Sequence, residues 1–291
     1  MTKNEVYQRV TDRIISELKK GVVPWRRPWA NKPAVSWLTQ KRYRGINSLL
    51  LPPGEYATFK QVEKAGGRVK KGAKGNLVVY FDRLKIEDKD TGEEIVIPFQ
   101  RNYTVFEINT QCEGLASKWK TREAIQSPLE EAEKIIKGYE DKPPIYFKSG
   151  RAFYAPALDY ISVPPIIDYE KAEAYYSTIF HEMVHSTGHK SRLNREGIAT
   201  MAGHFGSEIY SKEELVAEIG AGMLCAECGI DNSTLENSAA YIGGWLKALN
   251  NDQKLIFHAA SYAQKAVDWI LGIYSKQEED VEVNQDEKVS R

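Results

Sequence analysis

The sequence has little cysteine and no long apolar run. Its 291 residues include three cysteines, Cys112, Cys225 and Cys228, and a set this sparse and odd in number does not form a disulfide framework. The first residues do not resemble a secretory signal, and no stretch approaches the roughly 18 apolar residues that cross a bilayer. These absences argue against a secreted disulfide scaffold and an integral membrane protein. We expect a cytoplasmic protein in a reducing compartment, without a membrane partner.

The sequence also lacks a net charge, but that balance averages two unlike halves. The chain holds 40 basic and 40 acidic residues. Residues 1–125 contain 24 Lys and Arg against 14 Asp and Glu, whereas residues 126–291 contain 16 against 26. The first 80 residues alone contain 17 basic and 5 acidic residues. Such asymmetry is typical of two domains, of which the basic one binds a polyanion.

The pattern of apolar residues predicts an α+β fold class with two domains. We expect a small basic α+β domain over residues 1–125 and a mostly helical domain with a short β-sheet over 126–276, separated by the hydrophilic stretch 116–127. Residues 277–291 include six acidic residues in fifteen and almost no large apolar ones. We therefore expect this acidic tail to be disordered.

Individual elements follow from periodicity and turn residues. Val6, Val10, Ile14 and Leu18 recur every four residues, which predicts a helix that ends near Gly21. Further helices are expected over 59–64, 128–139, 170–187, 211–227, 235–249 and 252–274, and strands over 77–86, 94–100, 103–108, 145–147, 152–155 and 160–163.

The strongest chemical signal is the segment Phe180-His181-Glu182-Met183-Val184-His185, an HExxH motif in a helix with interleaved apolar residues. His181 and His185 are one helical turn apart, so both imidazoles leave the same face and can bind one metal ion. Glu182 follows the first ligand, where its carboxylate can take a proton from a metal-activated water. The alternative, two core histidines on a buried helix, is the weaker interpretation because the five-residue pattern is uncommon by chance. We predict a catalytic Zn²⁺ site, with Mn²⁺ or another divalent ion as the alternative metal.

A catalytic zinc ion needs a third protein ligand. Glu214 and Glu218 lie one turn apart on a later helix, near small residues that allow close helix packing, while His204 and His189 are rival ligands by residue type. The segment Glu214-Leu-Val-Ala-Glu218 resembles the Glu-x-x-Ala-Asp/Asn signature of gluzincin metallopeptidases. That resemblance implies that Glu214 binds the metal and that Glu218 orients a ligating histidine, although the two roles can be reversed.

Other residues of the second half carry weaker signals. Tyr210 or His204 can stabilise an oxyanion during peptide hydrolysis, and nothing in the sequence chooses between them. Cys225 and Cys228 have the spacing of a redox pair, but they fall within a predicted helix and lack a second pair. We expect two buried thiols.

The basic half alternates aromatic and basic side chains, a combination that holds single-stranded nucleic acid because cations neutralise phosphates and rings stack on bases. A glycine-rich segment, residues 66–75, adds backbone amides and lysines that can contact phosphate. Trp37, in a strand-like run, is the aromatic residue most expected in the core. The residues expected to contact DNA are Trp25, Arg26, Arg27, Trp29, Lys41, Arg42, Tyr43, Arg44, Lys70 and Lys71.

Nearly the whole chain resembles the ArdC-type antirestriction proteins of conjugative plasmids and other mobile elements. The N-terminal marks are residues 7–15, 21–29, 43–47, 66–72 and 105–111, and the C-terminal marks are residues 180–189, 213–220 and 236–242. The resemblance implies an N-terminal domain that binds single-stranded DNA, fused to a zincin-like metallopeptidase domain. It also implies a role in protecting incoming DNA from host restriction during conjugation.

The preferred interpretation is a DNA-binding peptidase that acts on a host protein, such as a component of the restriction machinery. Two other functions are alternatives to it. One is a non-catalytic shield that coats single-stranded DNA and carries a structural or vestigial metal site. The other is a hydrolase that acts on DNA itself, for which the carboxylate-rich two-metal arrangement is not apparent in the sequence. Sequence alone does not supply the protein substrate.

Overall fold

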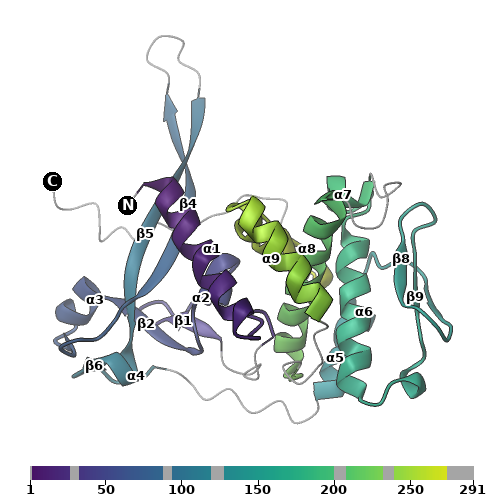
Figure 1. Cartoon of the computed structure of the whole chain (residues 1–291). Helices are drawn as coiled ribbons and strands as arrows, with labels where there is room; N and C mark the ends of the chain where they lie inside the picture. Colours follow the sequence, from purple (N-terminus) through teal and green to yellow (C-terminus); the bar gives the residue numbers. More distant parts are fainter. Residues whose placement is uncertain are drawn as a thin grey trace.

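The computed structural model describes residues 2–26, 33–87, 94–118, 128–199, 208–231 and 239–273. These residues form an α+β protein, as predicted, with a β-rich N-terminal part and a mostly helical C-terminal part (Figure 1). The predicted acidic tail lies outside the described residues.

The first helix, α1 (Lys3–Lys19), confirms the helix predicted from the four-residue spacing of apolar side chains. Thr2 and Glu5 form a capping box that satisfies free amides at its start, and Gly21 follows its end with a φ of 78°. Val6, Val10, Ile14 and Leu18 are all buried.

The main N-terminal sheet has the order β1-β2-β5-β4, with β1 and β2 parallel and the other pairs antiparallel. The two longest strands form a hairpin that extends away from the rest of the molecule (Figure 1). The separate strands predicted over 94–100 and 103–108 are one strand, because Arg101 and Asn102 continue the ladder opposite Tyr80 and Val79. The strands are β1 (Ala34–Ser36), β2 (Gly54–Thr58), β4 (Asn76–Glu87) and β5 (Glu94–Glu107).

Short elements complete the N-terminal part. The predicted helix over residues 59–64 is present as α3, with a capping box from Thr58 and Gln61. Trp37 is buried beside Ala57 and Val62, as expected for a core aromatic residue. The short elements are α2 (Ile46–Leu50), α3 (Phe59–Lys64), α4 (Ile108–Gln111) and the two-stranded sheet of β3 (Arg68–Val69) and β6 (Cys112–Glu113).

The C-terminal part places one helix between a small sheet and a second helix. The small sheet has the order β7-β9-β8, and α6 lies between this sheet and α8 (Figure 1). The predicted helices and strands of this region are present, with ends that differ by a few residues. Their bounds are α5 (Pro128–Gly138), β7 (Ile145–Phe147), β8 (Phe153–Ala155), β9 (Tyr160–Val163), the 3₁₀ turn η1 (Ile166–Asp168), α6 (Ala172–Thr187), α7 (Glu196–Ala199), α8 (Glu208–Cys228), α9 (Ala239–Asn251) and α10 (Leu255–Ile270).

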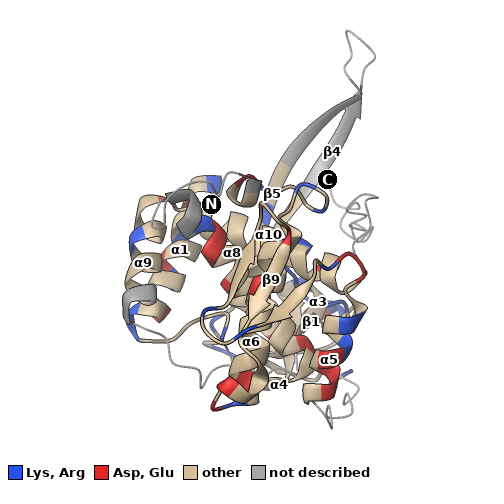
Figure 2. Cartoon of the chain, turned by 90° about the vertical axis from the view of Figure 1, so that its right-hand side faces the viewer, with Lys and Arg blue, Asp and Glu red and all other residues tan. Residues whose placement is uncertain are grey.

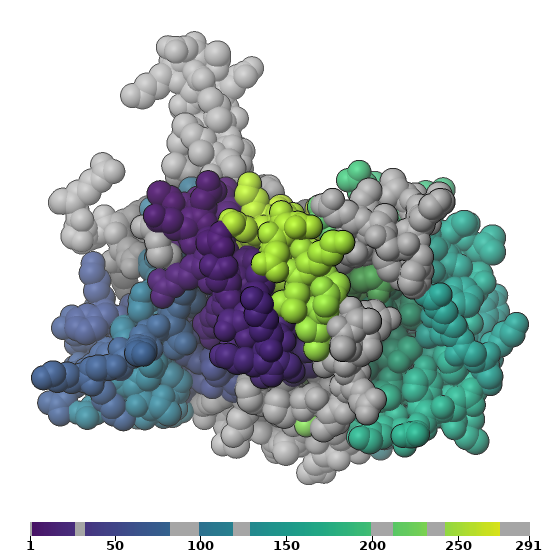
Figure 3. All heavy atoms as spheres, in the orientation of Figure 1, coloured from purple at the N-terminus to yellow at the C-terminus, as the bar shows by residue number. Residues whose placement is uncertain are grey.

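The largest apolar cluster joins the two parts of the chain. It contains residues of α1 and α2 together with residues of α5, α6, α8, α9 and α10. Helices α1 and α9 lie side by side in the ribbon and space-filling views (Figures 1 and 3). The N-terminal helix therefore packs on the helices that follow the HExxH motif.

The predicted domain boundary, residues 125 and 126, falls between residues 118 and 128, outside the described part, and remains a prediction. Among the described residues, no helix combines the length and the apolar character needed to cross a membrane.

Candidate metal centre

The HExxH motif occupies the last turns of α6. Ile179 and Phe180 before the motif and Met183 and Val184 within it are fully buried, so the helix is fixed on several faces. The predicted end of this helix at residue 187 is confirmed, because α6 ends at Thr187 and Gly188 is its C-cap. A Cβ added at position 188 would lie 2.4 Å from Cγ1 of Ile198, so a glycine lets the next segment return close to the helix end.

The two motif histidines converge as predicted. Their ring centroids are 4.7 Å apart, and the two Nε2 atoms are separated by 3.0 Å. His185 is 4% exposed, and the His181 side chain is 17% exposed. One side of the pair therefore reaches solvent while the other is enclosed.

Glu214 on α8 completes a three-residue group. Its Oε2 lies 3.5 Å from Nε2 of His181 and its Oε1 lies 3.4 Å from Nε2 of His185. Close packing of α6 and α8 makes this approach feasible, since a Cβ at Gly220 would lie 2.7 Å from Cγ2 of Val184. The small residues at this part of α8 therefore have the role expected from the sequence.

These distances fit a divalent metal ion. A tetrahedral ion with ligand bonds of about 2.0–2.1 Å holds its ligand atoms about 3.3–3.4 Å apart. The two Nε2 atoms are 3.0 Å apart, and each lies 3.4 or 3.5 Å from a different oxygen of Glu214. Two imidazoles and one carboxylate are the protein ligands of a catalytic zinc ion that retains a water position. Among the described residues, His181, His185 and Glu214 are the group whose ligand atoms converge in this way.

The second ring nitrogen of each histidine faces another carboxylate. Nδ1 of His181 lies 3.6 Å from Oε1 of Glu218, which agrees with the orienting role that the resemblance implied for Glu218. Nδ1 of His185 lies 3.3 Å from Oε1 of Glu213, a residue that is not among those predicted for the site. Carboxylates in these positions fix the tautomer and the orientation of a metal-binding imidazole.

Glu213 is held by a buried arginine. Nε of Arg195 donates to Oε2 of Glu213 at 3.1 Å, and Nη1 of Arg195 donates to Oγ1 of Thr187 at 2.6 Å. Burial opposes ionisation of Glu213, but Arg195 and His185 together lower its pKa. The adjacent pair Glu213-Glu214 is the sequence signal that could have indicated the role of Glu213. Consecutive residues of a helix point about 100° apart, so the two glutamates can contact different partners. Nothing in the sequence marked Arg195.

The charge of the site favours protonated histidines in the absence of a metal. Burial opposes protonation of His185, but hydrogen bonds with Glu213 and Glu214 outweigh it and raise the His185 pKa to about 10. The His181 pKa is raised in the same way, by Glu214 acting against burial. Glu214 has a lowered pKa because hydrogen bonds from both histidines overcome its burial. The same carboxylates would balance the charge of a bound cation.

Glu182 is buried beside this group, with 7% of its surface exposed. Its charge contributes to the raised pKa values of both histidines, so the carboxylate is within electrostatic reach of the metal position. This placement agrees with a proton-accepting role and not with a fourth ligand, since Glu182 is outside the converging group.

The remaining predictions for this half have mixed outcomes. His189 lies in the turn after α6, where its Nδ1 contacts Oγ of Ser191 at 2.8 Å, and it is not part of the metal group. Cys225 and Cys228 are buried free thiols, as expected. His204 and the side chain of Tyr210 lie outside the described residues, so their oxyanion role remains a prediction.

Of the described residues expected to contact DNA near the start of the chain, Trp25 is contradicted by the structure. Trp25 is 5% exposed and packs edge-on against Trp245 at a centroid distance of 5.1 Å, so its ring is not available for stacking on a base. Nη2 of Arg26 forms an ion pair with Oε2 of Glu218 at 3.0 Å. Arg27 and Trp29 lie outside the described residues.

The next group of expected DNA contacts is also partly engaged within the molecule. Arg42 pairs with Glu227 of α8, and Arg44 pairs with Asp268 of α10. Tyr43 is half-buried, its ring packs edge-on against Tyr56 at a centroid distance of 6.1 Å, and burial raises its pKa to about 12. Lys41 is exposed. Part of the charge difference between the two halves therefore reflects contacts between them, and basic and acidic segments lie intermixed on the face in Figure 2.

The two lysines of the glycine-rich segment remain at the surface. Lys70 and Lys71 are both exposed, in the turn between β3 and β4, and Nζ of Lys70 donates to the carbonyl of Thr110 at 2.9 Å. Their position is compatible with the predicted phosphate contact.

Two sequence families match the two parts of the chain. Residues 4–106 match the N-terminal domain of the anti-restriction factor ArdC. Residues 130–262 match the zincin-like metallopeptidase family MPTase-PolyVal, and this range includes the HExxH motif and Glu214.

Similar proteins include two that are much longer than this chain and one of about the same length. The DNA primase TraC of Escherichia coli is 34% identical over 301 residues, and the match covers 94% of this chain but 20% of TraC. A second DNA primase TraC of Escherichia coli is 35% identical, and the match covers 94% of this chain and 28% of that protein. The chain thus spans between a fifth and three tenths of the length of these two relatives. The uncharacterized protein y4eC of Sinorhizobium fredii is 32% identical, with 92% of each chain covered.

Solved structures of the antirestriction protein ArdC from plasmid R388 share the fold. The metal-free structure is 37% identical, covers 91% of this chain and 96% of its own, and gives a TM-score of 0.70. The Mn(II)-bound structure is 36% identical, covers 94% and 99%, and gives a TM-score of 0.73.

Proposed function

The chain belongs to the ArdC family of antirestriction proteins, and we propose that it binds single-stranded DNA and hydrolyses a protein substrate at the metal centre. In this proposal the metal is zinc, and the two activities together protect incoming DNA from host restriction during conjugation. The observation that carries the peptidase part is the convergence of His181, His185 and Glu214 beside the buried Glu182. The Mn(II)-bound relative supports a divalent ion in this family.

In the proposed reaction, the residues of the metal centre have separate roles. His181, His185 and Glu214 hold the ion, which when bound acidifies a water molecule and polarises the substrate carbonyl. Glu182 accepts the proton of the attacking water and then delivers it to the leaving amine. Glu213 and Glu218 hold the histidines in place through their Nδ1 atoms.

The DNA-binding part rests on the family match of the N-terminal region and on the basic excess of the first 80 residues. Lys41, Arg42, Arg44, Lys70 and Lys71 are the expected contacts that are exposed in the described structure, and Arg42 and Arg44 among them pair with acidic residues of the C-terminal helices. Single-stranded DNA is therefore proposed to bind on the N-terminal side that carries these lysines.

One substitution separates peptidase chemistry from DNA binding. Glu182→Gln removes the proton acceptor and keeps the side-chain shape, and Glu173→Gln makes the same chemical change in the first turn of α6, away from the centre. Both variants and the wild type would be tested for metal content, affinity for a single-stranded oligonucleotide, cleavage of β-casein, and DNA transfer into a restricting recipient.

We expect Glu182→Gln to retain metal and DNA while losing about 10²–10⁴-fold in cleavage rate and losing protection. Glu173→Gln should behave as the wild type. Loss of cleavage with intact protection would contradict the link between peptidase activity and antirestriction, and would favour a shield that acts by coating DNA.

A further inference from the structure

An ion pair connects the surroundings of the metal centre to the N-terminal part of the chain. Arg26 and Glu218 are 192 positions apart in the sequence, and their ion pair is mostly shielded from solvent, with side chains 13% and 16% exposed. Glu218 uses its two oxygens separately: Oε2 contacts Arg26 at 3.0 Å, and Oε1 lies 3.6 Å from Nδ1 of His181. An arginine of the basic half therefore contacts the carboxylate that faces a metal-binding histidine.

The other histidine has an equivalent arrangement. His185 faces Glu213, which in turn is held by Arg195. Each imidazole thus faces a glutamate, and each of these glutamates is paired with an arginine. The difference is the origin of the arginine, because Arg195 comes from the segment after α6 whereas Arg26 comes from the segment after α1.

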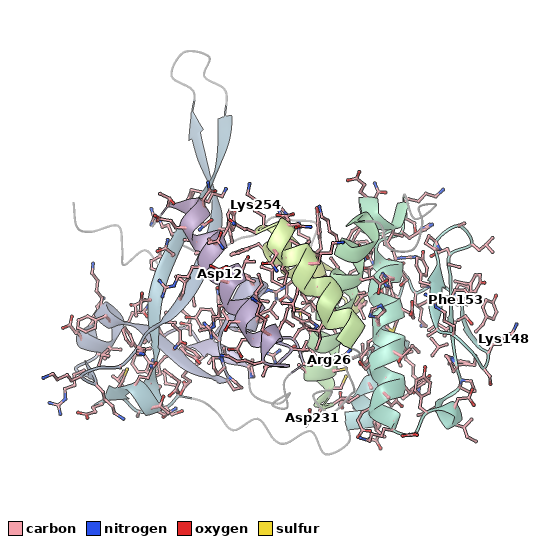
Figure 4. All side chains as sticks on the ribbon, viewed as in Figure 1. Asp12, Arg26, Lys148, Phe153, Asp231 and Lys254 are labelled. Atoms are coloured by element: carbon pink, nitrogen blue, oxygen red, sulfur yellow. The ribbon has the colours of Figure 1, made fainter. Side chains whose placement is uncertain are left out.

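The local sequence explains how Arg26 reaches α8. The amide of Arg26 donates to the carbonyl of Val23 at 3.0 Å, which closes a turn with Pro24 at its second position, where proline is favoured. Burial of Trp25 against Trp245 anchors this turn. Figure 4 shows Arg26 where the segment after α1 meets the C-terminal helices.

Gly222 permits the contact between this turn and α8. A Cβ at Gly222 would lie 2.3 Å from the carbonyl oxygen of Trp25, so any larger residue would displace the turn. Gly222 is one helical turn beyond Glu218 and shares its face. The glycine that receives Trp25 and the glutamate that receives Arg26 therefore form one docking position on α8.

We propose that Arg26 is a positioning residue of the metal centre: it holds Glu218 as the partner of His181 Nδ1. The reason is geometric. Without Arg26, the Glu218 carboxylate would be free to rotate away from Nδ1 of His181, and the imidazole would lose the contact that fixes its orientation. Pairing one oxygen with Arg26 leaves the other for His181. The metal site then depends on a residue from the N-terminal part, which is the part proposed to bind DNA.

This inference rests on the metal site of the proposed function and not on its peptidase activity. The test therefore measures metal binding in the full-length protein. Arg26→Ala removes the contact, and Arg26→Lys restores a positive charge without the planar, two-pronged geometry of arginine. Arg42→Ala is the matched control, since Arg42 also comes from the N-terminal part and pairs with a glutamate of α8, Glu227, that is outside the converging metal group.

We expect Arg26→Ala to weaken Mn(II) binding by about 10- to 100-fold, the usual effect of removing support for a metal ligand, with Arg26→Lys between it and the wild type. Arg42→Ala should bind Mn(II) as the wild type does. If Arg26 acts through Glu218, combining Arg26→Ala with Glu218→Gln should weaken binding no more than Glu218→Gln alone. The visible spectrum of the Co(II) form should change in Arg26→Ala, because His181 is no longer held in its orientation towards the ion.

Three results would overturn the inference: wild-type Mn(II) affinity in Arg26→Ala, an equal loss in Arg42→Ala, or additive losses in the double variant. Should Arg26→Ala not fold, Gly222→Ala displaces the turn while keeping Arg26 and Glu218, and it must then weaken Mn(II) binding for the inference to stand. Failure of the wild type itself to bind Mn(II), Co(II) or Zn(II) would instead refute the proposed metal site.

Discussion

Oε1 of Glu213 lies 3.3 Å from Nδ1 of His185, and both side chains are almost completely buried. The glutamate is also paired with Arg195, whose side chain is 4% exposed. Three ionisable groups thus share one enclosed volume beside the metal position. Such a group is favourable only while each charge has its partner, because an unpaired charge inside a protein is strongly destabilising.

Replacing Glu213 with alanine should lower the stability of the fold as well as the affinity for metal. Arg195 would keep its charge in a buried position without a carboxylate, which costs about 3–5 kcal/mol. Urea denaturation of the metal-free protein measures this change. Glu213→Gln retains a hydrogen-bond acceptor for Arg195 and should therefore be less destabilised than Glu213→Ala. If Glu213→Ala were as stable as the wild type, Arg195 would not be held by this contact.

The two glutamates of α8 that face His181 should differ in their effect on metal binding. Glu214→Gln removes a ligand charge and should reduce Mn(II) affinity well beyond the loss in Glu218→Gln, which removes support for a ligand and is expected to cost about 10- to 100-fold. Isothermal titration calorimetry of both variants provides the comparison. A larger loss in Glu218→Gln would reverse the assignment of the ligand.

Much of the centre could be predicted because its signals are local. His181 and His185 are one turn apart, and Glu182 is adjacent to a ligand, so helix geometry alone brings these groups together. Glu214 required the resemblance to other peptidases, since nothing local joins α8 to α6. Arg195 and Arg26 could not be found, because their roles arise from tertiary contacts that have no sequence spacing.

The N-terminal aromatic residues illustrate a different limit. A tryptophan beside arginines has the same sequence signature whether the ring stacks on a base or fills a core. Trp25 is buried because α1 and the segment after it pack on α8 and α9, and the sequence contains no sign of that packing. For the same reason the sequence pattern assigns Arg42 and Arg44 to DNA, although they pair with acidic residues of the C-terminal helices.

Substitutions of exposed lysines in the basic half should affect DNA binding, whereas substitutions of buried residues there should affect the stability of the fold. Lys70→Ala and Lys71→Ala should weaken binding of single-stranded DNA. The slope of the logarithm of the binding constant against the logarithm of the salt concentration should become shallower by about 0.7 for each phosphate that is no longer neutralised. Their thermal stability should be unchanged, because both side chains are exposed. Lys137→Ala, an exposed lysine of α5, is the control and should leave DNA affinity as it is.

Trp25→Ala should act on the fold instead. Removing a buried tryptophan costs about 3–5 kcal/mol, which calorimetry of the metal-free protein would detect as a lower melting temperature. Unchanged stability together with weaker DNA binding would mean that Trp25 leaves the core to contact DNA.

Metal binding and pH should be linked through His185. Its pKa is about 10 in the metal-free protein against the usual 6.5, so the charged imidazole stabilises the fold fully below pH 6.5, and this contribution is lost as the pH rises towards 10. A metal ion requires the neutral ring, so binding must displace the proton. Metal affinity should therefore increase between pH 6.5 and 8.5, by up to about tenfold per pH unit for each proton released.

Titrating Mn(II) calorimetrically in two buffers of different ionisation enthalpy counts these protons directly. The wild type should release at least one proton near pH 7, and the stabilisation given by a fixed Mn(II) concentration should grow as the pH rises. Glu214→Gln removes one of the carboxylates that raise the His185 pKa, so its proton release should be smaller at the same pH. Mn(II) affinity that does not vary over this range would show that His185 is already neutral, and that Glu213 and Glu214 do not hold its proton.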